Sequence, residues 1–270
     1  TYGHSKMTYG EALRSVKRLL RLYLTSLFQY EQLQIVQPCR TSPSADAYDR
    51  REWNDYWTPG NDAKSGVYDS IAFFYRQFII EPSLNRILAK YFTRGARVLH
   101  AGCGSGQVDI NICNRISIIA LDLSLDALRL YKSIHKDSCR MLHGSIFHIP
   151  LASASLDGIY NLGVMEHFTE DEIARILLEF NRALTQGGKI VLFWPPSFGA
   201  SVIVLKMVHF VLNRVLGQDV QLHPKEITYV KSKKQAAALL KESGFALVEY
   251  SFGPRDLFTY AVIVAEKEKA

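Results

Sequence analysis

The sequence predicts an α/β fold in which a mostly parallel sheet is flanked by helices. From Arg97 onward, apolar segments of strand length alternate with segments of helical periodicity, as crossover helices between parallel strands require. The first of these strands runs directly into a glycine-rich turn, and the second ends on Asp122. The chain has 270 residues and is 48% apolar, which suffices for one full core and an extension.

Each expected strand and helix is supported by a local pattern in the sequence. Strands are expected at 97–101, 117–121, 139–143, 156–161 and 189–194, and helices at 106–115, 124–135 and 170–185. Ser124 is a good N-cap for the second helix, and Thr169 with Glu172 forms a capping box for the third. Further on, a helix from Ser232 to Ser243 and an antiparallel strand pair at 245–251 and 257–265 are expected.

The glycine-rich turn has the pattern G-x-G-x-G at positions 102, 104 and 106. Glycine lets the backbone turn sharply and lets a ligand approach without meeting a Cβ atom. A dinucleotide-binding turn needs G-x-G-x-x-G instead, and here Gln107 or Asp109 stands at the last position. The spacing therefore argues against a nicotinamide-dependent oxidoreductase.

Asp122 is the second anchor of the predicted site. An acid at the tip of the second strand, about 20 residues beyond the first glycine, can bond both hydroxyls of a ribose. The competing interpretation is a helix cap, but Ser124 is better placed for that. Asp122 is therefore expected to face a ligand.

With its preceding strand, the glycine turn resembles motif I of the class I S-adenosylmethionine-dependent methyltransferases. Further stretches resemble the family in order: Leu142–Ile146, His148–Leu151, Leu156–Tyr160, Asn161–Phe168 and Leu184–Lys189. The likeness covers about 95–196 and is greatest to the methyltransferase type 11 and quinone-methyltransferase-like group. It implies a Rossmann-like seven-stranded sheet and S-adenosyl-L-methionine as cofactor. It also implies methyl transfer to an O, C or N atom of a small-molecule or lipid-like acceptor.

The resemblance also implies site residues. The cofactor-binding positions are Ala101, Gly102, Cys103, Gly104, Gly106, Asp122, Leu123, Ser145, Ile146, Asn161 and Leu162, with Tyr68 reaching in from an N-terminal helical pair. Ser145 stands where the family has an acid that meets the adenine amino group, and Gln186 stands where Pro is usual.

A general base helps if the acceptor is a phenol or an activated carbon. His167 is the first candidate, because it follows the fourth strand and has a suitable pKa. The alternative for His167 is a histidine that only starts a helix. Glu166, His148 and Tyr160 are weaker candidates. No metal site is expected, because the four cysteines show no ligand spacing.

Four regions follow from this interpretation. They are an N-terminal helical extension (1–92), the S-adenosylmethionine-binding core (93–199), a helical insertion or cap (200–231), and a last helix with the antiparallel pair (232–270). The apolar segment 198–216 has three interpretations: a substrate lid, a dimer contact or a membrane contact. The oligomeric state stays open.

The net charge of +6 suits nucleic acid or an anionic membrane, but a solvated basic face is the commoner cause. No RNA-binding signature is present, so no sequence-specific nucleic acid is expected. The amphipathic segment 11–36 carries a basic face, so a peripheral membrane contact is one expectation, with packing on the domain as the other. A cytoplasmic location is expected, at the inner face of a membrane if that contact exists. The alternatives are an RNA- or protein-directed methyltransferase and a non-catalytic S-adenosylmethionine-binding partner protein.

Overall fold

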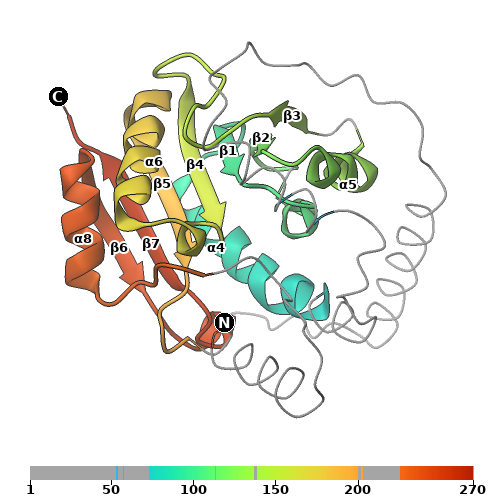
Figure 1. Cartoon of the computed structure of the whole chain (residues 1–270). Coiled ribbons are helices and arrows are strands. Elements are labelled where there is room, and N and C mark those ends of the chain that lie inside the picture. Colours follow the sequence, from blue (N-terminus) through green and yellow to red (C-terminus); the bar gives the residue numbers. More distant parts are fainter. Residues whose placement is uncertain are drawn as a thin grey trace, which may run out of the picture.

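The computed structural model describes residues 53, 57, 73–112, 114–136, 139–199, 202 and 226–269. Their centre is a seven-stranded sheet with the order β3-β2-β1-β4-β5-β7-β6 (Figure 1). The strands are β1 (Arg97–Ala101), β2 (Ser117–Asp122), β3 (Arg140–His143), β4 (Leu156–Leu162), β5 (Leu184–Trp194), β6 (Phe245–Ser251) and β7 (Ala261–Lys267). The first five strands pair in parallel, whereas β7 is antiparallel to both β5 and β6. The predicted fold class is confirmed.

Helices cover both faces of the sheet. The longer ones are α4 (Glu81–Tyr91), α5 (Leu125–His135), α6 (Glu170–Ala183) and α8 (Lys233–Glu242). A π-helix, η1 (Arg76–Ile80), leads into α4, and short 3-10 helices form η2 (Gln107–Asp109), η3 (Met165–His167) and η5 (Pro254–Asp256). Helices α6 and α8 lie on one face of the sheet, and α4 and α5 lie on the other (Figure 1).

The two faces carry two apolar clusters. Leu99 of β1 belongs to the same cluster as Phe180 of α6 and Leu240 of α8, whereas Val98 belongs to the other cluster, with Leu84 of α4. Successive residues of a strand point to opposite faces, so one short strand serves both clusters. A sheet that is buried on both sides reads as a nearly continuous apolar run, which is how β1 and β2 appear in the sequence.

The helix starts follow the predicted caps. The Ser124 hydroxyl accepts the backbone N–H of Ala127 at 3.3 Å, and the Ser232 hydroxyl accepts that of Gln235 at 3.1 Å. Thr169 and Glu172 form the reciprocal capping box at the start of α6. Each cap satisfies N–H groups that have no partner within the helix.

Three expected boundaries are wrong. The helix expected at 106–115 is only the 3-10 helix η2 followed by turns, in which Asp109 and Ile112 bond back three residues to Gly106 and Asp109. β-Branched and Asp or Asn residues fill this segment, and they are weak helix formers. The last strand begins at Ala261 rather than at residue 257, because Leu257 and Phe258 have φ values of +55° and +57°. Strand β5 begins at Leu184, before a register shift at the glycine pair 187–188.

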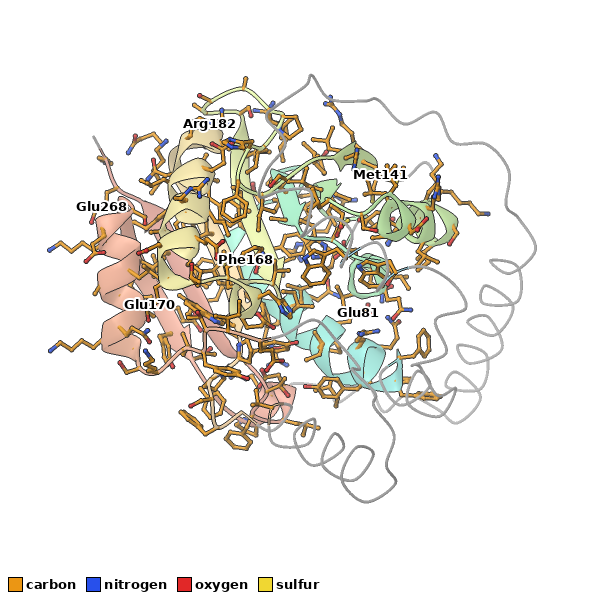
Figure 2. All side chains as sticks on the ribbon, in the orientation of Figure 1. Glu81, Met141, Phe168, Glu170, Arg182 and Glu268 are labelled. Carbon is orange, nitrogen blue, oxygen red and sulfur yellow. The ribbon has the colours of Figure 1, made fainter. Side chains whose placement is uncertain are left out.

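The connection between β3 and β4 is held against α6 by two side chains of that helix, Arg182 and Glu179. The Arg182 guanidinium donates to the backbone carbonyls of Leu151 and Ile149 at 3.0 Å each, and Figure 2 shows it at the end of α6. The Glu179 carboxylate accepts the backbone N–H of Ile149 at 2.6 Å. These contacts fix the segment that contains Ser145 and Ile146.

Several predictions fall outside the described residues. The helix expected at 11–36, Tyr68 and most of the segment 198–216 belong to this group. Within the described part of the chain, no helix combines the length and the apolarity that crossing a bilayer requires.

Candidate functional site

The predicted site residues lie where β1, β2 and β4 end. Strand β1 stands between β2 and β4, so the strand order reverses there. In open α/β sheets, ligands bind outside the carboxyl ends of the strands at such a switch point. The glycine turn follows β1, Asp122 ends β2, and Asn161 is the penultimate residue of β4.

The three glycines of the turn are each required by their surroundings. Gly102, Gly104 and Gly106 have φ values of +76°, +51° and +68°, which other residues rarely adopt. A Cβ on Gly102 would lie 2.8 Å from the Val164 side chain, and one on Gly104 would lie 2.7 Å from the Trp57 ring. A Cβ on Gly106 would overlap the Tyr131 ring. The turn is therefore packed against the loop after β4, against Trp57 and against α5.

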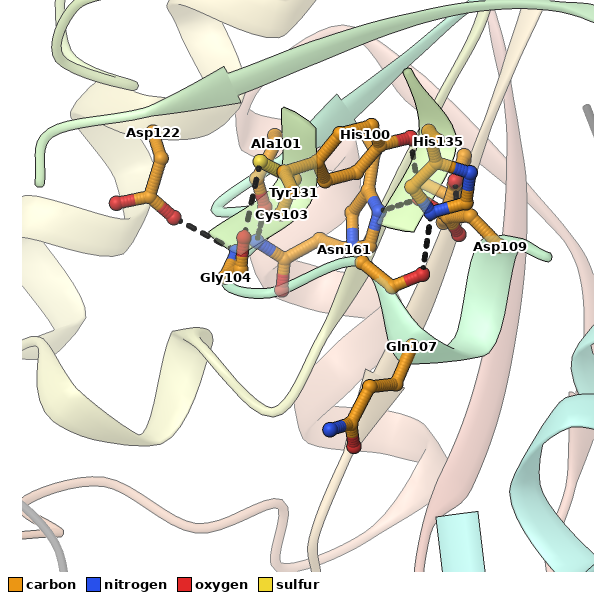
Figure 3. A network of polar contacts seen from close by, with 12 residues as sticks. His100, Ala101, Cys103, Gly104, Gln107, Asp109, Asp122, Tyr131, His135 and Asn161 are labelled. Atoms are coloured by element: carbon orange, nitrogen blue, oxygen red, sulfur yellow. Dashed lines mark hydrogen bonds and ion pairs between the residues drawn. The ribbon is translucent and has the colours of Figure 1, made fainter. Parts of the chain in front are cut away.

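The Asp122 carboxylate bonds to the backbone of the glycine turn and also lies at the edge of that turn. One carboxylate oxygen accepts the backbone N–H of Gly104 at 2.8 Å (Figure 3). The other oxygen accepts the backbone N–H of Ser124, also at 2.8 Å. Burial raises the pKa of Asp122, while the two N–H groups act against that rise. Each oxygen keeps a lone pair, so the carboxylate can still accept ribose hydroxyls. The sequence did not reveal the bond to Gly104.

Asn161 joins β4 to β1 and leaves one acceptor unused. Its amide nitrogen donates to the Ala101 carbonyl at 2.9 Å. Its Oδ1 atom is buried and, among the described residues, has no hydrogen-bond partner. A buried acceptor without a partner costs free energy, so a donor on a bound ligand is favoured here. The ammonium group of an amino-acid ligand is such a donor.

Beneath the turn lies a polar network around Asp109 (Figure 3). Asp109 is fully buried and contacts His100 Nδ1 at 2.7 Å, while the hydroxyls of Tyr131 and Tyr160 donate to it at 3.0 and 2.6 Å. His135 Nε2 lies 2.7 Å from the Gly106 carbonyl. This network supports the turn from inside, and the sequence motifs gave no sign of it. Its geometry also directs the Tyr160 hydroxyl into the core.

The loop after β4 carries the other base candidates. His167 lies on η3, half-buried, with its ring edge-on to Trp53 at a centroid distance of 5.0 Å. Glu166 is buried, and burial together with the Glu226 charge raises its pKa to about 8. His148 is exposed on the connection between β3 and β4.

The remaining predicted residues lie along the same edge. The backbone N–H of Gly144 bonds to the Asp122 carbonyl at 3.0 Å, which brings the end of β3 beside β2. There the Ser145 hydroxyl accepts the Phe147 N–H at 3.2 Å, and the Leu123 carbonyl lies 3.0 Å from His143 Nε2. Cys103 is buried, which raises the pKa of its thiol. Among the described residues, no cluster of His, Cys, Asp and Glu could hold a metal ion.

Comparison with known proteins agrees with this geometry. Residues 99–192 match the family described as "Methyltransferase domain". A curated relative from Encephalitozoon cuniculi (strain GB-M1), named as a methyltransferase, is 29% identical over 114 residues, or 42% of this chain and 51% of the relative. The match thus spans about half the length of that relative.

Solved structures share the fold at low identity. The magnesium protoporphyrin IX methyltransferase of Synechocystis PCC 6803, solved with bound S-adenosylhomocysteine, aligns with a TM-score of 0.55 at 16% identity, covering 83% of this chain and 95% of that one. A methyltransferase of Methanosarcina mazei aligns with a TM-score of 0.53 at 16% identity, covering 68% of this chain and 98% of that one.

Residues 99–192 therefore match a methyltransferase domain, and the described sheet has the fold of the class I S-adenosylmethionine-dependent methyltransferases. The matched domain description and the structure solved with bound S-adenosylhomocysteine point to S-adenosylmethionine as the cofactor to test. The glycine turn, the Asp122 carboxylate and the unused acceptor of Asn161 suit its backbone, its ribose and its amino group respectively.

Proposed function

We propose that this protein transfers the methyl group of S-adenosylmethionine to an O, C or N atom of a small-molecule acceptor. The observation that carries the proposal is the pair of polar groups at the β1–β4 switch point. Asp122 shapes the turn through Gly104, and the buried Oδ1 atom of Asn161 has no hydrogen-bond partner in the part of the chain that the structure describes. Together with the matched methyltransferase domain, they support a cleft for an amino-acid-bearing nucleoside.

Methyl transfer requires little covalent chemistry from the protein itself. The sulfonium group supplies an activated methyl group when the cofactor is bound. The protein has to align a nucleophile with the S–CH₃ bond and to exclude water, so positioning accounts for most of the acceleration. His167 and Glu166 lie on the loop after β4, and each carries a group that can take up an acceptor proton.

A screen with methyl-labelled S-adenosylmethionine tests this function. The protein is incubated with small-molecule fractions from a cell extract, and both labelled product and S-adenosylhomocysteine are measured. Formation of S-adenosylhomocysteine that depends on an added fraction is the expected result. Tight binding of S-adenosylhomocysteine with no transfer to any fraction would instead support a non-catalytic binding protein.

A lipid-like acceptor is the second candidate, and one surface feature favours it. Phe198, Phe252 and Phe258 form edge-to-face contacts at centroid distances of 5.3 and 5.6 Å. Phe198 is 56% exposed and Phe258 is 47% exposed, with the exposed Arg255 close by in the chain. Aromatic and basic groups together suit the surface of an anionic membrane.

Sedimentation with anionic vesicles tests this second candidate. At low salt, the protein is expected to pellet with the vesicles and to be released at high salt, because salt screens the charges. Replacing Phe198 and Phe258 by serine should reduce the pelleted fraction. If the protein stays in the supernatant at low salt, the acceptor is a soluble molecule.

A further inference from the structure

Glu166, on the loop after β4, and Tyr260, directly before β7, come together beside the glycine turn. Val164, on the loop after β4, fills the space next to Gly102. One residue earlier, a Cβ on Gly163 would lie 3.3 Å from the Tyr260 hydroxyl and 3.4 Å from Glu166 Oε1. The two side chains therefore flank one glycine at the end of β4, next to the predicted cofactor cleft.

The Glu166 carboxyl is buried, and only part of its hydrogen-bonding capacity is satisfied. The residue is 4% exposed, and within the part of the chain that the structure describes, its Oε2 atom has no hydrogen-bond partner. The Glu166 carbonyl accepts the backbone N–H groups of Ile227 and Thr228 at 2.6 and 3.0 Å, so the loop is held in place. A buried carboxyl oxygen without a partner is costly, and a ligand that donates to it recovers that cost.

The surroundings of this carboxyl resist negative charge. Burial and Glu226 raise the pKa of Glu166 to about 8. Burial, Glu166, Tyr75 and Glu226 likewise raise the pKa of Tyr260, against the opposing effect of Arg76. Burial, with the nearby Glu226 and Glu166, also raises the pKa of Tyr229. An anionic acceptor such as a phenolate is therefore disfavoured, whereas an amine is neutral when its lone pair reacts.

We propose that Glu166 and Tyr260 form the acceptor subsite. The methyl acceptor is then an amine whose N–H donates a hydrogen bond to the Glu166 carboxyl. This inference rests on the proposed function. At about pH 8 and above, where Glu166 is ionised, an ammonium ion that enters the site gives one proton to the Glu166 carboxylate and becomes a neutral amine. Tyr260 is a positioning residue, whose hydroxyl can accept a hydrogen bond from the amine or donate one to it.

The transfer step balances without any further reactant. The amine lone pair forms the N–C bond, and the S–C bond breaks with its electron pair left on sulfur. The product is an N-methylammonium ion, which leaves as a cation, and the proton on Glu166 returns to solvent. The carboxyl thus holds the proton that would otherwise block the lone pair.

Binding experiments with S-adenosylhomocysteine present test the subsite without measuring turnover. The probes are a panel of linear and aryl-substituted primary amines, the alcohols with the same carbon skeletons, and simple phenols. Melting temperatures and dissociation constants are measured for the wild type, Glu166→Gln, Tyr260→Phe and Glu242→Gln. Glu242 is an exposed glutamate on α8 and serves as the matched control.

Amines are expected to stabilise the wild-type complex and to bind Glu166→Gln at least about tenfold more weakly, a difference typical of a lost hydrogen bond to a charged group. Tyr260→Phe should show a smaller loss, and Glu242→Gln none. In infrared difference spectra, the band of a protonated carboxyl should disappear in Glu166→Gln.

Three results would overturn the subsite. The first two are that no amine of the panel binds, or that alcohols or phenols bind as well as amines. Equal amine binding by Glu166→Gln and the wild type would overturn it as well. The proposed function fails separately, if S-adenosylhomocysteine binds neither the wild type nor Glu242→Gln.

Discussion

The carboxylate of Asp122 accepts the backbone N–H of Gly104 at 2.8 Å, so the end of β2 fixes the turn that follows β1. This bond joins the two sequence features from which the site was predicted. The buried Asp122 carboxylate therefore shapes the turn, and its contact with a ribose stays a prediction.

Replacing Asp122 with alanine is expected to weaken S-adenosylhomocysteine binding by about 1–3 kcal/mol. The change leaves the Gly104 N–H without its acceptor and removes the acceptor for the ribose hydroxyls. Asp122→Asn keeps one acceptor oxygen and should lose less. Calorimetric titration measures both variants, and a dissociation constant unchanged in Asp122→Ala would show that the ribose is held elsewhere.

Alanine at Gly106 and at Gly104 should have different consequences. A Cβ at Gly106 meets the Tyr131 ring and His135, which are buried in the core, so Gly106→Ala should mainly lower the melting temperature. A Cβ at Gly104 meets the Trp57 ring at 2.7 Å, on the ligand side of the turn. Gly104→Ala should mainly weaken cofactor binding, and Gly104→Val should abolish it with the sheet still folded. Circular dichroism beside a binding titration distinguishes the two effects, and unfolding of Gly104→Val would contradict the assignment.

Removing the Tyr160 hydroxyl should destabilise the fold by about 1–3 kcal/mol, because Asp109 Oδ1 then loses a buried donor. Urea denaturation of Tyr160→Phe measures the change in the free energy of unfolding. Tyr250→Phe is the matched control, since the Tyr250 hydroxyl forms no hydrogen bond with the residues that the structure describes. Equal stabilities of the two variants would mean that the Asp109 network contributes little.

Glu166 should make stability depend on pH. Its pKa rises from 4.5 to about 8 on folding, so between these values the folded state binds more protons than the unfolded state. The stabilisation that Glu166 contributes is therefore fully present below about pH 4.5. The free energy of unfolding falls as the pH rises toward 8, by at most ~1.4 kcal/mol per pH unit from this group. Asp122 and Asp256 have raised pKa values of the same sign, so the comparison with Glu166→Gln isolates the Glu166 share. Parallel pH profiles for the two proteins would contradict the assignment.

The sequence predicted the sheet well because its strands are short, apolar and bounded by polar or glycine residues. β1 was predicted to the residue, and β2 and β4 each extend one residue further. The segment after Gly106 was predicted wrongly, because apolar spacing indicated a helix while its β-branched and Asp or Asn side chains disfavour one. Left-handed backbone at Leu257 and Phe258 could not be read from residue types, since these residues rarely adopt it.

Only part of the candidate site could be predicted from the sequence. Motifs record residues that are close in sequence, and they brought Gly104 and Asp122 into one site. The partners of Asp109 come from β1, α5 and β4, and the pairing of Glu166 with Tyr260 spans most of the domain. Such long-range contacts depend on the strand order, which the sequence alone does not give.

The most direct test of the central claim is a calorimetric titration of the whole protein with S-adenosylhomocysteine and, separately, with NADH. A cleft built on the G-x-G-x-G turn and Asp122 should bind S-adenosylhomocysteine and raise the melting temperature by mass action, with little response to NADH. Tighter binding of NADH than of S-adenosylhomocysteine would contradict the account.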